Sequence, residues 1–173
     1  RWRIEHAQIL DPLDIPRFAP LGVIASMQPV HQTSDRHMAE VRLDPARLKG
    51  AYAWKSLLAS GARLAFGSDA PVEVPDVFAG LAAAITREDA AGEPFGGWQP
   101  QERISREDAI AGYTTGAAFA SFAETRIGRL APGLWADFIL IDRDPLLTTP
   151  ADLRGTKVLE TWVAGRKLFS RPN

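Results

Sequence analysis

Two short segments of the sequence each end in a side chain that can bind a metal ion. The first is Arg3-Ile4-Glu5-His6 and the second is Phe66-Gly67-Ser68-Asp69. Each begins with apolar or β-forming residues and is followed by residues typical of a loop and then a helix. In parallel α/β barrels the reactive side chains lie at the carboxyl ends of the strands. The pattern therefore predicts that His6 and Asp69 emerge from the same edge of a parallel sheet and face a shared metal ion.

The other two histidines, His31 and His37, lie in a polar stretch that we expect to be a long loop, residues 28–43. A catalytic zinc site generally has about three protein ligands and an open position for water. His6 and Asp69 supply two, so a loop histidine is a candidate for the third. Each of these residues also has an ordinary structural explanation. A solitary His often forms a structural hydrogen bond, an Asp after a strand often forms a turn, and His37 would simply be exposed to solvent.

The elements that must position these side chains follow from apolar spacing and from glycine and proline signals. Strands are expected at about 2–6, 23–27 and 64–66, with helices at about 12–21, 48–60, 76–85, 105–114 and 117–122 and a Gly-rich loop at 88–103. The alternation of strand and helix predicts parallel neighbours joined by right-handed crossovers.

The sequence pattern changes near residue 127, from alternating strand and helix signals to strand and turn signals alone. Pro132-Gly133 indicates a turn, residues 137–142 alternate as a strand does, and residues 158–169 are typical of a hairpin around Ala164-Gly165. We therefore expect two domains, an α/β domain over 1–126 and a layer of β-sandwich strands over 127–173.

Composition limits the classes of function. The 173 residues are 46% hydrophobic, and 20 basic residues balance 21 acidic ones, so no basic face for nucleic acid or anionic lipid is expected. There is no cysteine, which excludes disulfides, thiolate nucleophiles and Cys-based zinc sites. No apolar run is long enough for a membrane helix, so we expect no membrane partner and a cytoplasmic location. A small, nearly neutral molecule is the expected substrate.

Several motifs, in order along the chain, resemble the carboxyl-terminal part of the amidohydrolase superfamily, in particular its amidohydrolase-3 branch of N-substituted formamide deformylase-like enzymes. The motifs are Arg3-Ile4-Glu5-His6-Ala7-Gln8, Ala25-Ser26-Met27-Gln28-Pro29 with His31, Gly67-Ser68-Asp69-Ala70-Pro71, Tyr113-Thr114-Thr115-Gly116-Ala117-Ala118, Ile127-Gly128 with Leu130, Pro132-Gly133, Ala136-Asp137, Asp142 and Asp144-Pro145. The resemblance covers residues 1 to about 169.

The resemblance implies the last three βα units of a (β/α)8 TIM barrel followed by strands of a small β-sandwich. It implies a divalent metal, zinc in our prediction, with one or two ions in the full-length parent. His6 and Asp69 would bind the metal, Asp69 would also be the catalytic proton acceptor and donor, and His31 would bind the substrate. The reaction would be hydrolysis of a non-peptide carbon–nitrogen bond in an amide-type small molecule.

The resemblance also implies ligands that this chain lacks. Members of the family carry a His-x-His pair, and this sequence contains none. We therefore expect a fragment that is inactive alone and that associates with a second copy or with the missing amino-terminal part, since its barrel strands would have unpaired edges. Two alternatives stay open: a non-catalytic binding or assembly module derived from the same fold, and an autonomous α/β domain whose motif matches are accidental.

Overall fold

The computed structural model describes residues 1–172, which form a mixed α/β structure with two three-stranded sheets. The first sheet contains β1 (Arg3–Glu5), β2 (Ile24–Met27) and β3 (Arg63–Phe66), and the second contains β4 (Phe138–Ile141), β5 (Val158–Val163) and β6 (Arg166–Ser170). The helical segments are η1 (Ile15–Arg17), α1 (Pro29–Arg42), α2 (Pro45–Leu48), α3 (Trp54–Ala59), α4 (Val77–Thr86), η2 (Pro100–Glu102), α5 (Arg106–Ala111), η3 (Gly112–Gly116), α6 (Ala117–Ala120) and α7 (Pro150–Arg154).

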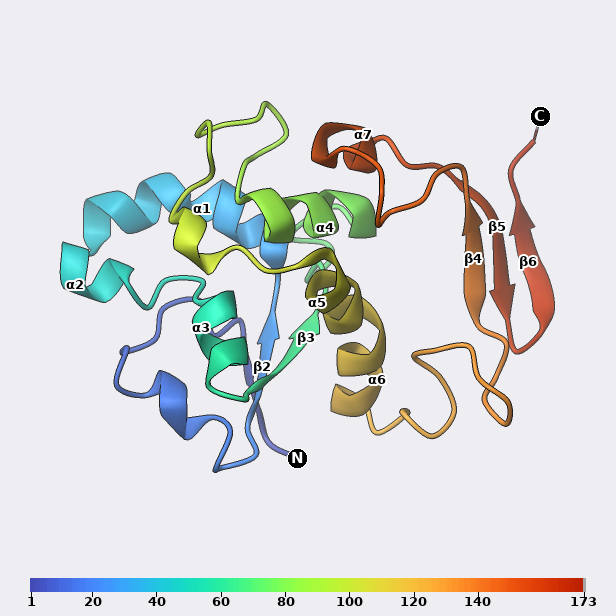
Figure 1. The fold of residues 1–173 in the computed structure, drawn as a ribbon, viewed down its shortest axis with the longest axis horizontal. Helices are drawn as coiled ribbons and strands as arrows, with labels where there is room; N and C mark the ends of the chain where they lie inside the picture. The colour runs from blue at the N-terminus through green and yellow to red at the C-terminus, as the bar shows by residue number, and fades with distance from the viewer. Residues whose placement is uncertain (173) are drawn as a thin grey trace.

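The first sheet is parallel, as the order of strand and helix predicts. Its order is β1-β2-β3, with Ile4 opposite Ala25 and Ser26 opposite Ala65. The central strand β2 is buried along most of its length, whereas β1 is exposed at every position. All three strands point the same way, so their carboxyl ends meet at one edge of the sheet, where α1 begins (Figure 1).

The expectation of a long loop over residues 28–43 is wrong, because this stretch contains the 14-residue helix α1. Its buried positions include Gln32, Arg36 and Ala39, which recur with helical spacing but are mostly polar. A search for apolar periodicity therefore misses the helix. Pro29 occupies its first turn, where a proline fits because the N–H it lacks would have no helical partner.

The helix expected at 48–60 is also broken in two. The segment Gly50–Tyr52 leaves helical geometry, and Tyr52 has φ +50°. The amide of Tyr52 donates to the carbonyl of Gln8 over 2.6 Å, and the amide of Leu10 donates to the carbonyl of Gly50 over 3.0 Å. These bonds tie the segment that follows β1 to the segment that precedes α3.

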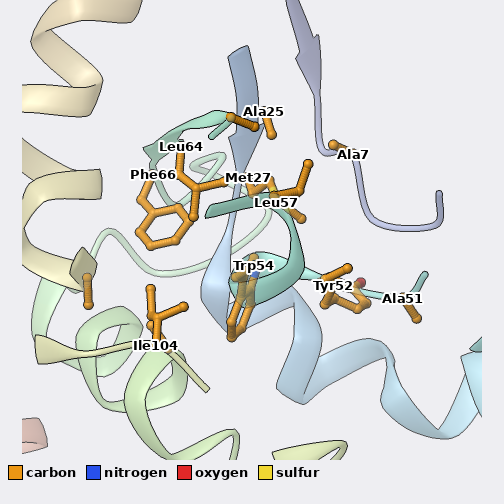
Figure 2. Close-up of a cluster of buried hydrophobic side chains, with 14 of the residues drawn as sticks. Ala7, Ala25, Met27, Ala51, Tyr52, Trp54, Leu57, Leu64, Phe66 and Ile104 are labelled. Carbon is orange, nitrogen blue, oxygen red and sulfur yellow. The ribbon is translucent and has the colours of Figure 1, made fainter. Parts of the chain in front are cut away.

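The core lies between the parallel sheet and the helices that follow it. Figure 2 shows Met27, Leu57, Leu64, Phe66 and Trp54 gathered in this cluster, with Trp54 fully buried. Trp98, in the Gly-rich stretch 88–103, is buried too, and its indole N–H donates to Glu40 over 2.7 Å. Trp98 therefore packs against the body of the protein.

The second sheet is antiparallel, in the order β4-β5-β6, and stands beyond α5 and α6 in Figure 1. The rings of Phe138 and Trp162 stack across β4 and β5 with centroids 5.5 Å apart. Asp142 accepts from the amide of Lys157 over 2.9 Å, and Asp137 accepts from the amide of Ala164 over 2.6 Å, so both aspartates support the backbone of this sheet. Among the described helices, none is long and apolar enough to cross a membrane.

Candidate metal centre

Three elements bring side chains of types that can bind a metal ion to the edge where the parallel strands end. His6 follows directly after β1, Asp69 follows β3 by three residues, and His31 lies in the first turn of α1, which starts just after β2. The carboxyl ends of neighbouring parallel strands share an edge, so these positions become neighbours although they are far apart in sequence.

The three side chains converge. One ligand atom of each of His6, His31 and Asp69 lies within 4.8 Å of the others. Zinc binds such nitrogen and oxygen atoms at about 2.0–2.2 Å, so adjustments of about 1 Å would bring the set to bonding distance. The imidazole rings of His6 and His31 also face one another, with centroids 5.8 Å apart and planes 24° apart.

The backbone at both strand ends adopts left-handed geometry. His6 has φ +67°, the next residue Ala7 has φ +42°, and Asp69 has φ +55°. Aspartate tolerates this region, but two consecutive residues with positive φ and ordinary side chains are uncommon in proteins. Such strained positions cluster at functional sites, where they direct a side chain that a regular strand would aim elsewhere.

Gln28, at the carboxyl end of β2, orients the His6 ring. Its side-chain oxygen lies 2.9 Å from Nδ1 of His6, and Gln28 is buried, with 7% of its surface exposed. Because an amide oxygen accepts and does not donate, this contact is a hydrogen bond in the His6 tautomer that carries the proton on Nδ1. Nε2 of His6 is then left with a free lone pair, which is the form of histidine that binds a metal.

His31 supports the same interpretation. It is 6% exposed, and its Nε2 is buried without a hydrogen-bond partner among residues 1–172. A buried polar atom without a partner is costly, and a missing ion or ligand is one of its ordinary explanations. Two imidazoles, one of them with an unpartnered nitrogen, and one carboxylate form a donor set that suits zinc and similar divalent ions.

Glu5 lies beside the cluster but is not part of it. The Ser26 hydroxyl, together with Arg3, holds the pKa of the Glu5 carboxyl below its ordinary value. Glu5 also forms an exposed ion pair with Arg3, two residues earlier on β1.

The structure therefore brings together all three residues singled out in the sequence, His6, His31 and Asp69, and leaves His37 exposed on α1. Sequence reasoning gave no role to Gln28, although the residue stands at a strand end next to a proline. That position is the available signal, since a polar side chain there faces the same edge as His6.

The chain matches the model of the amidohydrolase family over residues 1–169. It is 36% identical to Protein LONG AFTER FAR-RED 3 of Arabidopsis thaliana over 170 residues, and 28% identical to N-substituted formamide deformylase of Arthrobacter pascens over 178 residues, each alignment covering 98% of this chain. It also resembles the crystal structure of an uncharacterized metal-dependent hydrolase from Pyrococcus horikoshii OT3, with a TM-score of 0.75 and 34% identity over 86% of this chain.

The matches cover only part of each relative. The chain spans 29% of the Arabidopsis protein, 31% of the Arthrobacter enzyme and 30% of the Pyrococcus chain.

Proposed function

This chain belongs to the amidohydrolase family, and from that premise we propose that His6 and Asp69 bind a divalent metal in a hydrolase that cleaves carbon–nitrogen bonds. The single observation that carries the proposal is the convergence of His6, His31 and Asp69 within 4.8 Å at the carboxyl edge of a parallel sheet. The proposed architecture is the end of a (β/α)8 barrel over residues 1–126, followed by β-sandwich strands over residues 127–173.

His6 would bind through Nε2, the nitrogen that the hydrogen bond from Nδ1 to Gln28 leaves free. Asp69 would bind through a carboxylate oxygen and would balance part of the metal's charge. A divalent metal, zinc in our proposal, supplies a Lewis acid that polarises a carbonyl and allows water to ionise near pH 7.

Asp69 is the proposed catalytic residue. Its carboxylate accepts a proton from the attacking water and then donates that proton to the nitrogen of the departing amine. A single carboxylate can do both because it faces the water before attack and the amine afterwards. An amide or hydroxyl side chain at position 69 would be unable to accept the proton.

His31 is proposed to face the substrate, where an imidazole N–H would donate to the carbonyl oxygen as negative charge develops on it. One nitrogen of its ring is also close enough to the other two ligand atoms to be a third metal ligand, and its Nε2 has no hydrogen-bond partner within residues 1–172. The two roles differ in one measurable respect. Loss of a ligand weakens metal binding, whereas loss of a substrate contact leaves it nearly unchanged.

The proposed substrates are non-peptide amides, which is the chemistry that the name of the Arthrobacter relative describes. The chain spans less than a third of its relatives. We therefore propose that further ligands come from a part of the whole protein outside these residues and that the chain alone does not turn over substrate.

The experiment is a calorimetric titration of the chain with Zn²⁺, in parallel with His6→Ala, Asp69→Ala and His31→Ala. His37→Ala is the matched control, because His37 lies on α1 outside the cluster. We expect the first two variants to weaken Zn²⁺ binding at least about tenfold and the control to leave it unchanged. Equal affinity for all five proteins would refute the proposal.

Turnover is tested in the whole protein that contains these residues, loaded with Zn²⁺ and supplied with an N-substituted formamide. Asp69→Asn keeps the size of the side chain but removes the proton acceptor, so kcat should fall by about 10² to 10⁴. Asp11→Asn, at an exposed position away from the cluster, is the control. An Asp69→Asn enzyme with unchanged kcat would contradict the assigned role.

A further inference from the structure

Three side chains next to the metal-binding cluster form a closed set of hydrogen bonds, the Gln8–Asp35–Tyr52 network. The Gln8 amide donates to Asp35 Oδ2 over 3.1 Å and to the Tyr52 hydroxyl over 2.9 Å. The Tyr52 hydroxyl in turn donates to Asp35 Oδ2 over 2.8 Å. Both amide hydrogens and the phenolic hydrogen therefore have acceptors inside the network.

The network connects the two segments that carry the histidines. Gln8 lies two residues after His6, in the segment where the backbone has left the strand. Asp35 lies on α1 four residues after His31, which is about one helical turn and places both on the same side of the helix. The hydrogen bond between Gln8 and Asp35 thus joins the segment after β1 to α1 near both histidines.

Tyr52 is held in place by burial and by hydrogen bonds of its backbone. It is 1% exposed, its amide donates to Gln8 over 2.6 Å, and its carbonyl accepts from the buried guanidinium of Arg87 over 2.9 Å. Burial and the nearby Asp35 carboxylate raise the pKa of the Tyr52 phenol above its ordinary value. The hydroxyl therefore remains protonated, and remains a donor to Asp35, at neutral pH.

We propose that the Gln8–Asp35–Tyr52 network positions His6 and His31 for metal and substrate, with Tyr52 as the anchoring residue. The inference deepens the proposed function and rests on it for the identity of the site. The physical reason is that a ligand set works only if its members are held close to the geometry the ion requires, and supporting hydrogen bonds supply that restraint. None of the three side chains belongs to the ligand cluster, so each acts through the residues it holds.

The test uses Tyr52→Phe, which removes one hydroxyl and keeps the buried ring. The matched control is Tyr113→Phe, the same change at the other tyrosine of the chain, whose hydroxyl packs against Gly80. The first readout needs no metal: the nuclear Overhauser cross-peak between the ring protons of His6 and His31, whose centroids lie 5.8 Å apart. The chain has three histidines, and the exposed His37 provides a reference signal.

The second readout is the affinity for Co²⁺, followed by its visible absorption. We expect Tyr52→Phe to weaken the cross-peak and to weaken Co²⁺ binding about tenfold or more, while Tyr113→Phe matches the wild type in both. Should Tyr52→Phe fail to fold, judged by its circular dichroism, Gln8→Met removes the two donated bonds from a half-buried position and takes its place.

The outcomes separate this inference from the function on which it rests. A folded Tyr52→Phe protein with an unchanged cross-peak overturns the positioning role, whatever the metal result. An unchanged Co²⁺ affinity, in a wild type that binds Co²⁺, overturns it as well. A wild type that shows the cross-peak but binds no Co²⁺ counts against a metal site formed by this chain's residues alone, and the cross-peak then decides whether the network positions the two rings.

Discussion

Two buried glutamines, Gln28 and Gln32, are four residues apart and allow a matched test of the metal centre. Gln28 is 7% exposed and accepts from Nδ1 of His6 over 2.9 Å. Gln32 is fully buried on α1, and neither atom of its amide has a hydrogen-bond partner among residues 1–172. Methionine has nearly the same length and shape as glutamine and no amide, so Gln28→Met and Gln32→Met delete the same group in two different environments.

Gln28→Met should weaken Zn²⁺ binding. Removing the outer hydrogen-bond partner of a ligating histidine typically costs about 10–100-fold in affinity, which is about 1.4–2.8 kcal/mol at 1.4 kcal/mol per tenfold. The substitution leaves the start of α1 intact, because the Gln28 side chain makes no capping hydrogen bond. Nitrogen-15 spectra of His6 should show that the proton no longer resides mainly on Nδ1.

Gln32→Met should instead raise the stability of the fold and leave Zn²⁺ affinity unchanged. The buried amide makes no hydrogen bond that could offset its desolvation, so its removal should raise the free energy of unfolding by about 1–3 kcal/mol. Zn²⁺ affinity should not change, since the Gln32 amide makes no hydrogen bond to the His6 ring or to any other group within residues 1–172. Isothermal titration with Zn²⁺ and unfolding in urea measure the two quantities. If both variants lose Zn²⁺ affinity equally, or neither does, the Gln28–His6 hydrogen bond does not prepare His6 for the metal.

Three further predictions concern the stability and association of the chain. Gly50→Ala should lower the free energy of unfolding, measured in urea, by about 1–3 kcal/mol, because its new Cβ would lie 1.8 Å from the carbonyl oxygen of Leu10. Gly67→Ala is the control, since a Cβ there meets no atom within 4 Å, and it should change the free energy of unfolding by no more than about 0.5 kcal/mol; equal losses for the two variants would contradict this. Arg143 and the Lys157 amide hold the pKa of the Asp142 carboxyl well below its ordinary value of 3.8, so the stabilisation it gives is present above that pH and is lost as the pH falls further. Asp142→Asn should therefore reduce the loss of thermal stability on acidification below pH 3.8, and an identical acid profile would count against it. In light scattering the chain should be a dimer or larger, because β1 and β3 each pair on one side alone within residues 1–172, and a monomer would contradict this.

The parallel sheet could be predicted from the sequence because its strands are short apolar segments bounded by clear helix signals. The positions of His6 and Asp69 followed from the rule that reactive side chains lie at the carboxyl ends of such strands. Neither conclusion needed the path of the chain between the strands.

Helix α1 could not be predicted in the same way. Its packed face contains Gln32 and Arg36, so the apolar spacing that reveals most helices is absent, and polar residues that are buried in the fold look like loop residues in the sequence. The sequence therefore predicts only a loop around His31. Its approach to His6 depends on the start of a helix that the sequence does not signal by hydrophobicity.

The contacts around Tyr52 depend on tertiary structure even more than helix α1 does, so the sequence does not predict them. The left-handed backbone of Tyr52, its bond to the carbonyl of Gln8 and its hydroxyl contact with Asp35 join three segments that are distant in sequence. Local propensity would continue the helix through this position, and the hydrogen bonds to the segment after β1 override it.

We propose that His6 and Asp69 bind the same ion, and an anomalous difference map at the zinc absorption edge, from crystals of the chain grown with Zn²⁺, tests this. We expect a peak between the His6 imidazole and the Asp69 carboxylate, at about 2.0–2.2 Å from a ligand atom of each. Zinc peaks confined to other parts of the surface, or a zinc-free cluster in crystals soaked with excess Zn²⁺, would contradict it.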